Sequence, residues 1–306
     1  RVEARIQELE PMLTEPAEPT PEETAMAEAL TRDGLLALYE QMVEEDLAAT
    51  RAMNVISIPN DLPRLRARET PKAMIPFTGD GGSMNPAPLF GTASTGWWNV
   101  ENFSPDWTLE RRLEAVLSPR RRTQTWFGTY AVHEGVPGHH LQLSLFRGNP
   151  QPVRTILWDN PSVEGWGLYA ESLFWRHGGF GDAPEAEHIT LRSYLYRLRR
   201  VIYDVNVETG RWTLEEAAAW KSGPDSAVDR DILRAIQWPT QLIGYAVGHW
   251  QIDALRKELH ADQGAAFNER DFHDAIIGMG AIPVSLMRAK LLGLPIPKPN
   301  AFRAQA

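Results

Sequence analysis

The stretch from residue 129 to residue 142 constrains the fold of this chain more than any other. It reads TYAVHEGVPGHHLQ and gathers His133, Glu134, His139 and His140 within eight residues. An aromatic and aliphatic lead-in over residues 126–132 predicts that this cluster lies on a buried helix rather than in an exposed tail. Pro137 and Gly138 then interrupt the helix, because proline removes a backbone N–H donor and glycine tolerates the change in dihedral angles. An unbroken helix is therefore not expected through this stretch, which carries histidines on both sides of Pro137 and Gly138.

His133 followed by Glu134 is typical of zinc hydrolases, in which the imidazole binds the metal and the carboxylate faces the water that the metal activates. The second histidine usually follows four residues later, but that position is Pro137 here. On an unbroken helix, at about 100° per residue, His140 would lie within about 20° of His133, and His139 about 120° away. A bulge that absorbs one or two residues would return His139 to the face of His133. Periodicity alone thus favours His140 as the second ligand, whereas an interruption at Pro137 and Gly138 makes His139 a candidate again. Alternatively, these histidines only pack in the core or lie on the surface and bind no metal.

Two carboxylates farther along the chain are suited to complete such a site. Glu164 lies 25 residues after His139, the kind of spacing at which a separate helix supplies a third ligand. Glu164 and Glu171 are seven residues apart and so share one helical face, among aromatic and aliphatic neighbours. Burying two carboxylates is costly without a cation, and zinc would supply one. One carboxylate would bind the metal, while the other would hold a ligand histidine by its free ring N–H. Two solvated acids on an amphipathic helix are the alternative.

Two motifs together carry a resemblance to a known family. They are His133-Glu134-x-x-Pro137-Gly138-His139-x-x-Gln142 and Glu164-Gly165-Trp166-x-x-Tyr169-x-Glu171. With residues 241–248 and 272–274, they make residues 75–292 similar to the bacterial domain-of-unknown-function family 885, a family of the gluzincin zinc-metallopeptidase type. The resemblance implies a helical catalytic domain in which His133, His139 and Glu164 bind Zn²⁺. Members of the family are usually longer, so the chain resembles mainly their catalytic C-terminal portion.

Peptide hydrolysis requires further groups. Glu134 is the expected general base. The oxyanion that forms at the carbonyl needs a hydrogen-bond donor, and Tyr245, within one of the resembling segments, is the predicted donor. A tyrosine buried only for packing is the plain alternative. His249, four residues after Tyr245, and His273 are further candidates for this role, and Arg200 is a candidate substrate contact.

The chain is predicted to be mainly α, with a few short strands before the site helix. An N-terminal helical segment, residues 1–53, precedes a catalytic metal-binding domain, residues 54–306, unless the two form one continuous domain. Extended segments are expected at residues 56–59, 73–77 and 91–100, with turns at 79–82. The last of these places Trp97, Trp98 and Asn99 near the cleft, where a strand could pair with a substrate backbone.

Helical periodicity and start signals account for most of the remaining chain. Helices are expected from residue 21 onward and at residues 34–53, 108–117, 123–136, 141–146, 161–177, 185–207, 236–259, 272–279 and 284–292. Thr20 and Thr213 are expected to cap two of these helices, the second with a capping box.

Composition excludes several classes of function. The 306 residues carry a net charge of −9 and no basic run interleaved with aromatic residues, which argues against a nucleic-acid partner. The absence of cysteine excludes disulfides, thiolate metal ligands and cysteine nucleophiles. No stretch approaches the roughly 18 apolar residues of a membrane-spanning helix. The chain starts at Arg1 without a signal-like segment, so the expected compartment is the cytoplasm, or the periplasm or exterior if a signal was removed.

These features predict a zinc-dependent metallopeptidase that acts on peptide bonds through activated water and a glutamate base. The same residues would also serve a zinc-dependent amidase or esterase that acts on a small molecule, because metal ligands do not encode the substrate. A helical module that keeps a metal only for stability is the third possibility. The expected partner is accordingly a peptide or amide substrate, and the sequence does not indicate an oligomeric state.

Overall fold

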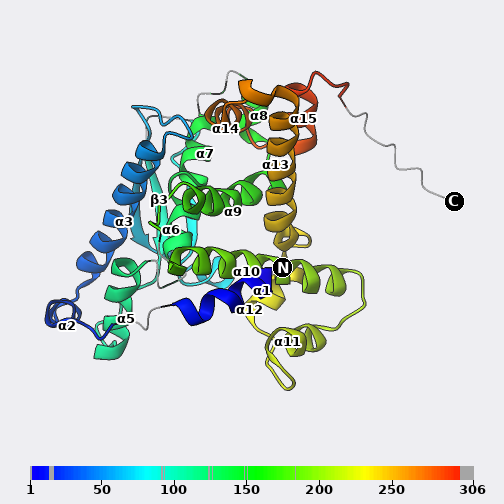
Figure 1. Cartoon of the computed structure of the whole chain (residues 1–306). Helices are drawn as coiled ribbons and strands as arrows, with labels where there is room; N and C mark the ends of the chain where they lie inside the picture. The colour runs from blue at the N-terminus through cyan, green and yellow to red at the C-terminus, as the bar shows by residue number, and fades with distance from the viewer. Residues whose placement is uncertain are drawn as a thin grey trace.

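The chain folds into a mainly α structure with one small sheet, as predicted (Figure 1). This computed structural model describes residues 2–13, 17–90, 92, 94–122, 125, 127–147, 149, 151–182 and 184–296. The first helices are α1 (Val2–Leu9), α2 (Pro21–Glu28), α3 (Arg32–Met53), α4 (Ile75–Thr78) and α5 (Leu109–Arg120), with a 3-10 turn η1 (Glu10–Met12). The later ones are α6 (Phe127–Glu134), α7 (His139–Phe146), α8 (Pro152–Ile156), α9 (Asn160–Arg176), α10 (Pro184–Glu208), α11 (Leu214–Ser222), α12 (Arg230–Gln237), α13 (Gln241–Gln263), α14 (Glu269–Gly278) and α15 (Val284–Leu291), with a 3-10 turn η2 (Gly264–Ala266). Among these described residues, no helix has both the length and the apolar character needed to cross a membrane.

Side-chain caps fix where several helices begin. At α2, Thr20 accepts a hydrogen bond from the backbone N–H of Glu23, and the Glu23 carboxylate accepts one from the N–H of Thr20. Thr213 and Glu216 form the same capping box at α11, so both predicted caps are confirmed. Asp159 caps α9 through a backbone N–H of its first turn.

A buried asparagine ties the three strands of the sheet together. The strands are β1 (Arg64–Glu69), β2 (Ser83–Asn85) and β3 (Thr95–Val100). Their order is β1–β3–β2, with β1 parallel and β2 antiparallel to β3. The Asn99 amide donates to Ser83 Oγ (3.0 Å) and Asn85 Oδ1 (2.8 Å), and its oxygen accepts from Arg68 Nε (2.7 Å). Asn99 is thus a structural residue of the sheet, and β2 lies at the end of the strand order.

The segment between α3 and α5 departs from prediction in two places. Residues 73–77, expected to be extended, contain the short helix α4, because Pro76 lies in its first turn, where a missing N–H costs little. Residues 56–59 form no strand. Conversely, β1 was not expected, since four of the six residues in its sequence RLRARE are charged, although Leu65 and Ala67 between them are buried. The expected extended segment 91–100 is confirmed over β3, while residues 91 and 93 lie outside the described part.

The single helix expected at residues 236–259 is two helices. α12 ends at Gln237 and α13 begins at Gln241. Between them stands Pro239, followed by Thr240 in a left-handed conformation with φ of 68°, so the helical path is interrupted. The site helix expected at residues 123–136 begins at Phe127 in the described part, and residues 123, 124 and 126 lie outside it.

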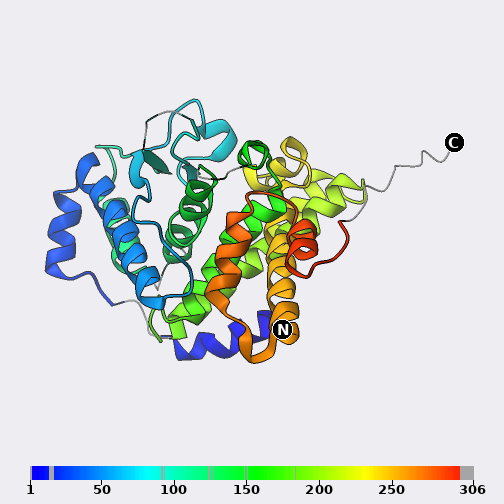
Figure 2. The same cartoon turned by 90° about the horizontal axis from the view of Figure 1, so that it is seen from above.

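α9 occupies the centre of the molecule (Figures 1 and 2). Its most extensive contact is with α13, and it also packs against α6, α7 and α10. α9 and α13 approach closely at Gly165 and Gly248, where a Cβ on either residue would overlap the backbone of the other helix. This close crossing requires glycine at both positions and holds α9 deep in the core.

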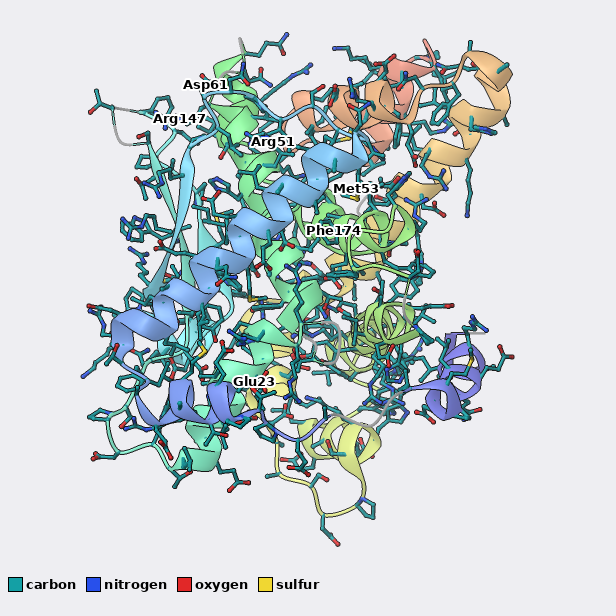
Figure 3. The ribbon with its side chains drawn as sticks, turned by 60° about the vertical axis from the view of Figure 1, so that its left-hand side comes forward. Glu23, Arg51, Met53, Asp61, Arg147 and Phe174 are labelled. Carbon is teal, nitrogen blue, oxygen red and sulfur yellow. The ribbon has the colours of Figure 1, made fainter. Side chains whose placement is uncertain are left out.

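α3 covers the other side of the site helix (Figure 3). It packs against β1, α5 and α6, and the ring of Tyr39 meets that of Trp98 edge-on at 5.2 Å. At its C-terminal end, Met53 lies against the buried cluster that contains Phe174. Residues on both sides of position 53 therefore share a core, and the division of the chain at that position stays a prediction.

Candidate metal centre

The break in the site helix brings the two histidines together. α6 ends at Glu134 and α7 begins at His139, so the predicted bulge is in fact a complete helix end. Gly138 is required there, because a Cβ would overlap the carbonyl oxygen of His133. The connecting loop is fixed by Trp166, whose indole N–H donates to the carbonyl of Pro137 at 2.9 Å. The rings of His133 and His139 consequently lie 4.6 Å apart, nearly perpendicular.

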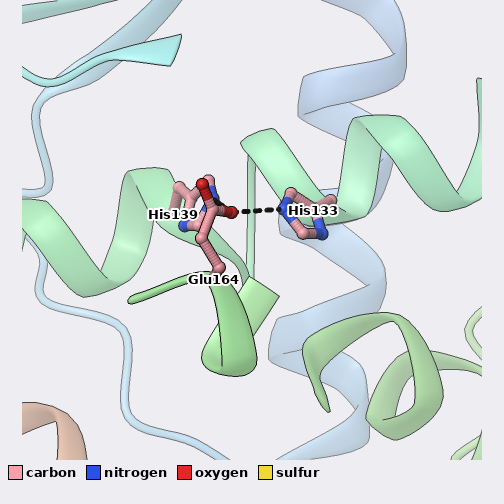
Figure 4. Close-up of side chains that lie close together, drawn as sticks. All are labelled: His133, His139 and Glu164. Carbon is pink, nitrogen blue, oxygen red and sulfur yellow. Dashed lines mark hydrogen bonds and ion pairs between the residues drawn. The ribbon is translucent and has the colours of Figure 1, made fainter. Parts of the chain in front are cut away.

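The carboxylate of Glu164 on α9 lies between these two rings (Figure 4). Its Oε2 is 3.4 Å from His133 Nε2 and 3.2 Å from His139 Nε2. One ligand atom from each residue lies within 4.8 Å of the other two. Two imidazole nitrogens and a carboxylate oxygen are the donor set of a catalytic zinc site. The structure thus brings the three predicted ligands together in a group that could hold a metal ion.

His140, the ligand favoured by periodicity, lies outside this group. Its Nε2 donates to the carbonyl of Pro63 at 2.6 Å, and burial lowers its pKa to about 4. The periodicity argument fails because α7 is a separate helix, whose register does not continue that of α6. His139 is therefore the histidine that accompanies His133.

Glu171 orients His133 from behind, as predicted. His133 Nδ1 lies 2.8 Å from Glu171 Oε1, and Ser193 donates to the other carboxylate oxygen. Although burial opposes ionisation, Arg197 and His133 hold the pKa of Glu171 below its usual range. An ionised Glu171 accepts a hydrogen bond from the Nδ1–H of His133. The imidazole is then in the tautomer whose Nε2 carries a lone pair that can bind a metal.

Three residues without a predicted role support the centre from other helices. Gln241 donates to Glu164 Oε1 at 2.9 Å and to the Tyr245 hydroxyl at 3.3 Å. Ser193 holds Glu171, and Arg197 donates to Ser193 Oγ at 2.7 Å. The sequence carries only a partial signal for these residues. Gln241 lies one helical turn before Tyr245, and Ser193 lies one turn before Arg197, so each pair shares a helix face.

The small residues of α9 make room for the centre. A Cβ at Gly167 would lie 2.5 Å from Cε1 of the His133 ring. The imidazole therefore packs directly on the α9 backbone, one turn from Glu164 and one turn from Glu171. A glycine at this position lets one helix supply both a ligand and its support.

The carboxyls beside the centre differ in their electrostatics. Burial raises the pKa of Glu134 to about 7, although the neighbouring His139 opposes the shift. Glu164 is largely shielded from solvent as well, but hydrogen bonds from His133 and His139 hold its pKa well below the usual range. Glu164 is thus suited to bind a cation, whereas Glu134 is suited to exchange a proton near neutral pH.

A cavity of about 1190 Å³ opens onto the centre. Glu134 and Tyr245 line it together with the three candidate ligands. Tyr245 is buried and stacks on His133 with ring centroids 5.9 Å apart. Burial and the charge of Glu164 raise its pKa, so its hydroxyl stays protonated and can donate a hydrogen bond.

The other predicted site residues are divided between the cavity and the core. Arg200 and Trp98 line the cavity, whereas its lining in the described part includes neither Trp97 nor Asn99. His249 and His273 do not line it either. His249 lies 3.4 Å from Ser172 Oγ, while the ring of His273 bridges the carbonyl of Val55 and the hydroxyl of Tyr169.

A family model described as a bacterial protein of unknown function, DUF885, matches residues 1–291. The chain belongs to this family. The match confirms the family inferred from the motifs and extends it to the N-terminal helices, beyond the segment 75–292 that carried the resemblance. No curated protein matches this DUF885 chain.

Two solved structures share the fold of the DUF885 chain. One is described as a candidate lipoprotein of unknown function from Shewanella oneidensis, with 20% identity and a TM-score of 0.72 over 95% of this chain and 53% of that one. The other is described as a candidate lipoprotein from Colwellia psychrerythraea, with 23% identity and a TM-score of 0.71 over 95% of this chain and 50% of that one. The chain thus spans about half the length of these structures.

Proposed function

We propose that this protein is a zinc-dependent metallopeptidase of the gluzincin type. The observation that carries the proposal is the convergence of His133, His139 and Glu164 on the wall of a large cavity, with Glu134 beside them. These three residues would hold the ion, and their two nitrogens and one oxygen fit zinc. Zinc, when bound, supplies a Lewis acid and makes water nucleophilic at neutral pH.

The residues around the ion would carry the proton transfers. Glu134 takes a proton from the attacking water, whose oxygen forms a bond to the carbonyl carbon. The C–N bond then breaks, and the released amine takes the proton that Glu134 carries. Tyr245 donates a hydrogen bond to the carbonyl oxygen as negative charge develops on it. Glu171 keeps His133 in the tautomer and orientation that this geometry needs.

The edge of the sheet offers a place for the substrate backbone. Within the described residues, β2 pairs only with β3, and Ser83 and Met84 of β2 line the cavity. An extended peptide that adds to this edge would form backbone hydrogen bonds beside the metal centre. This arrangement favours a peptide over a small amide or ester, which has no backbone to pair.

The location of the protein is a further part of the proposal. The two solved structures named above are both described as candidate lipoproteins. We therefore place this protein outside the cytoplasm. Cell fractionation with an antibody against the natural protein tests this placement, and recovery in the cytoplasmic fraction contradicts it.

The peptidase proposal is tested with Glu134→Gln, which keeps the shape of the side chain and removes its basicity. Elemental analysis should find zinc in the wild type and in the variant, because Glu134 is not a ligand. Hydrolysis of a peptide mixture, followed by mass spectrometry, should be at least about 100-fold slower in the variant. Full activity in the variant removes Glu134 from the mechanism, and wild-type activity only on non-peptide esters or amides refutes the peptidase assignment.

A further inference from the structure

One wall of the cavity is strongly basic, although the whole chain is acidic. The net charge is −9, yet α10 and α12 present five arginines to this one space. They are Arg192, Arg197 and Arg200 of α10 and Arg230 and Arg234 of α12. A local excess of guanidinium groups inside a cleft raises the concentration of anions there.

The positive charge of this wall is only partly neutralised. Arg197 is committed to Ser193 and Glu171, behind the metal centre. Arg200 pairs with Asp231 at 2.7 Å, but the same carboxylate also pairs with Lys221 at 3.2 Å. For the remaining three arginines of the wall, no carboxylate in the described part of the chain forms an ion pair. The wall therefore retains unpaired positive charge.

Buried donors on this wall also lack acceptors. Arg200 is 7% exposed, and its Nε has no hydrogen-bond partner among the described residues. The Nε of Arg234 is likewise buried without such a partner, while its guanidinium lies over the ring of Trp238 at 5.1 Å. Buried guanidinium N–H groups are costly to leave unpaired, and a carboxylate can satisfy two of them at once.

The distance from the metal centre limits which group of a substrate can reach this wall. The Tyr245 ring lies 5.9 Å from that of His133, and the Arg200 guanidinium carbon lies 5.3 Å from the Tyr245 ring. These two contacts place the Arg200 guanidinium at most about 11 Å from the His133 ring. An extended chain of no more than about three residues covers that distance. Arg200 pairs with Asp231, which lies one turn before Arg234 on α12, and both arginines line the cavity, so Arg234 lies in the same neighbourhood.

We propose that Arg200 and Arg234 form a carboxylate subsite that binds the C-terminus of a short peptide, one to three residues beyond the cleaved bond. This inference rests on the proposed peptidase function and specifies it as removal of residues from the C-terminal end. The same two guanidinium groups could also bind the carboxylate of an acidic side chain. The test therefore distinguishes a C-terminal carboxylate from a side-chain carboxylate.

The test compares N-acetyl-trialanine as the free acid with the same peptide as its C-terminal amide. Binding is followed by tryptophan fluorescence, because Trp158 and Trp238 line the cavity, and Glu134→Gln serves as the background to prevent cleavage. The free acid should bind about 10- to 100-fold more tightly than the amide. Equal binding of the two, or binding of neither, overturns the subsite. An amide with glutamate at its second position that binds as tightly as the free acid overturns the C-terminal assignment.

Substitutions then assign the subsite to its residues. Adding Arg234→Gln should bring the affinities of acid and amide within about threefold of each other, since one of the two charges is lost. Arg234 forms no ion pair with a described residue, so its replacement strands no carboxylate, and circular dichroism with urea unfolding checks that the variant folds as the wild type does. Arg199→Gln is the matched control, because Arg199 neighbours Arg200 but pairs with Glu3 outside the cavity. An acid preference that survives Arg234→Gln overturns the assignment to Arg234.

Because binding is measured without turnover, the two proposals fail separately. Preference for the free acid without any hydrolysis by the wild type refutes the peptidase function and leaves the subsite in place. Hydrolysis of acid and amide at equal rates, with equal binding, refutes the subsite and leaves the peptidase function in place.

Discussion

At the scale of single residues, Glu171 determines which ring nitrogen of His133 would face a bound metal. Replacing it with glutamine keeps the side-chain shape but removes the charge that accepts the Nδ1 proton of His133. We expect zinc affinity to fall about 10- to 100-fold, as with other carboxylates that hold a ligand histidine. Competition with a chromophoric chelator measures this. The control is Glu258→Gln, a surface carboxylate paired with Arg288, and equal affinities in the two variants would contradict the role of Glu171.

Gly167 is the second residue on which the centre depends. In Gly167→Ala the added methyl group would lie 2.5 Å from the His133 ring, so the ring or α9 must move. We expect a loss of about 1–3 kcal/mol in the free energy of unfolding, together with weaker zinc binding. Urea titration and chelator competition test both effects. Gly278→Ala, where a Cβ would meet open space, should change neither, and an undisturbed Gly167→Ala would mean that His133 does not pack on α9 as described.

Most of the candidate site could be predicted from residue types and spacing, but its supporting contacts could not. His133 and Glu164 followed from the order and spacing of the motifs. The choice of His139 over His140 came from the family resemblance, because periodicity cannot be extended through a helix end. Gln241 was not predicted because its partner, Glu164, lies 77 residues away, and no local pattern records such a contact.

At the scale of elements, helices were predicted better than strands for a physical reason. A helix is held by local hydrogen bonds and side-chain caps, so the capping boxes at Thr20 and Thr213 mark its start directly. A strand such as β1 is held by its partner β3, about 30 residues later in the chain. Its own sequence is mostly charged and therefore did not indicate a strand. Asn99, expected near the cleft, instead joins the strands, a contact that becomes visible only when all three are in place.

The Glu23 carboxylate in the capping box of α2 should stabilise the fold to an extent that depends on pH. Hydrogen bonds from Arg121 and the Thr20 backbone lower the pKa of Glu23 from 4.5 to about 2. A carboxyl with a lowered folded-state pKa stabilises the fold above its unfolded pKa and loses that effect as pH falls towards 2. Glu23→Gln should therefore cost about 1 kcal/mol at pH 7, and the difference from the wild type should shrink below pH 4. Urea unfolding at pH 7 and pH 3 measures it.

The neighbouring residue provides the control for this cap. Glu22 is exposed, and its 3.4 Å pair with Arg120 lies at the surface, so Glu22→Gln should change stability little at either pH. A loss in Glu23→Gln that is the same at pH 7 and pH 3 would show that the charge of Glu23 is not what the cap uses.

At the scale of the whole molecule, the candidate centre depends on how α9 is held. α6, α7 and α9 each contribute one candidate ligand, while α10 and α13 supply Ser193, Arg197, Gln241 and Tyr245 around it. The glycine crossing of α9 and α13 sets the depth of Glu164 and brings Gln241 to it. Because the ligands are positioned by packed helices rather than by a loop, the site should be formed before a metal arrives.

This argument predicts how metal should affect the stability of the whole chain. An ion that binds only the folded protein, at a free concentration about 1,000 times its Kd, stabilises it by about 4 kcal/mol. Thermal unfolding of the wild type should shift upward by several degrees with zinc, while far-ultraviolet circular dichroism after chelation should still show a helical fold. His139→Ala should abolish the shift, whereas His140→Ala should retain it, because the His140 ring donates to the carbonyl of Pro63 and lies outside the candidate ligand group. Unfolding on chelation alone would contradict a preformed site and favour a module that uses metal for stability.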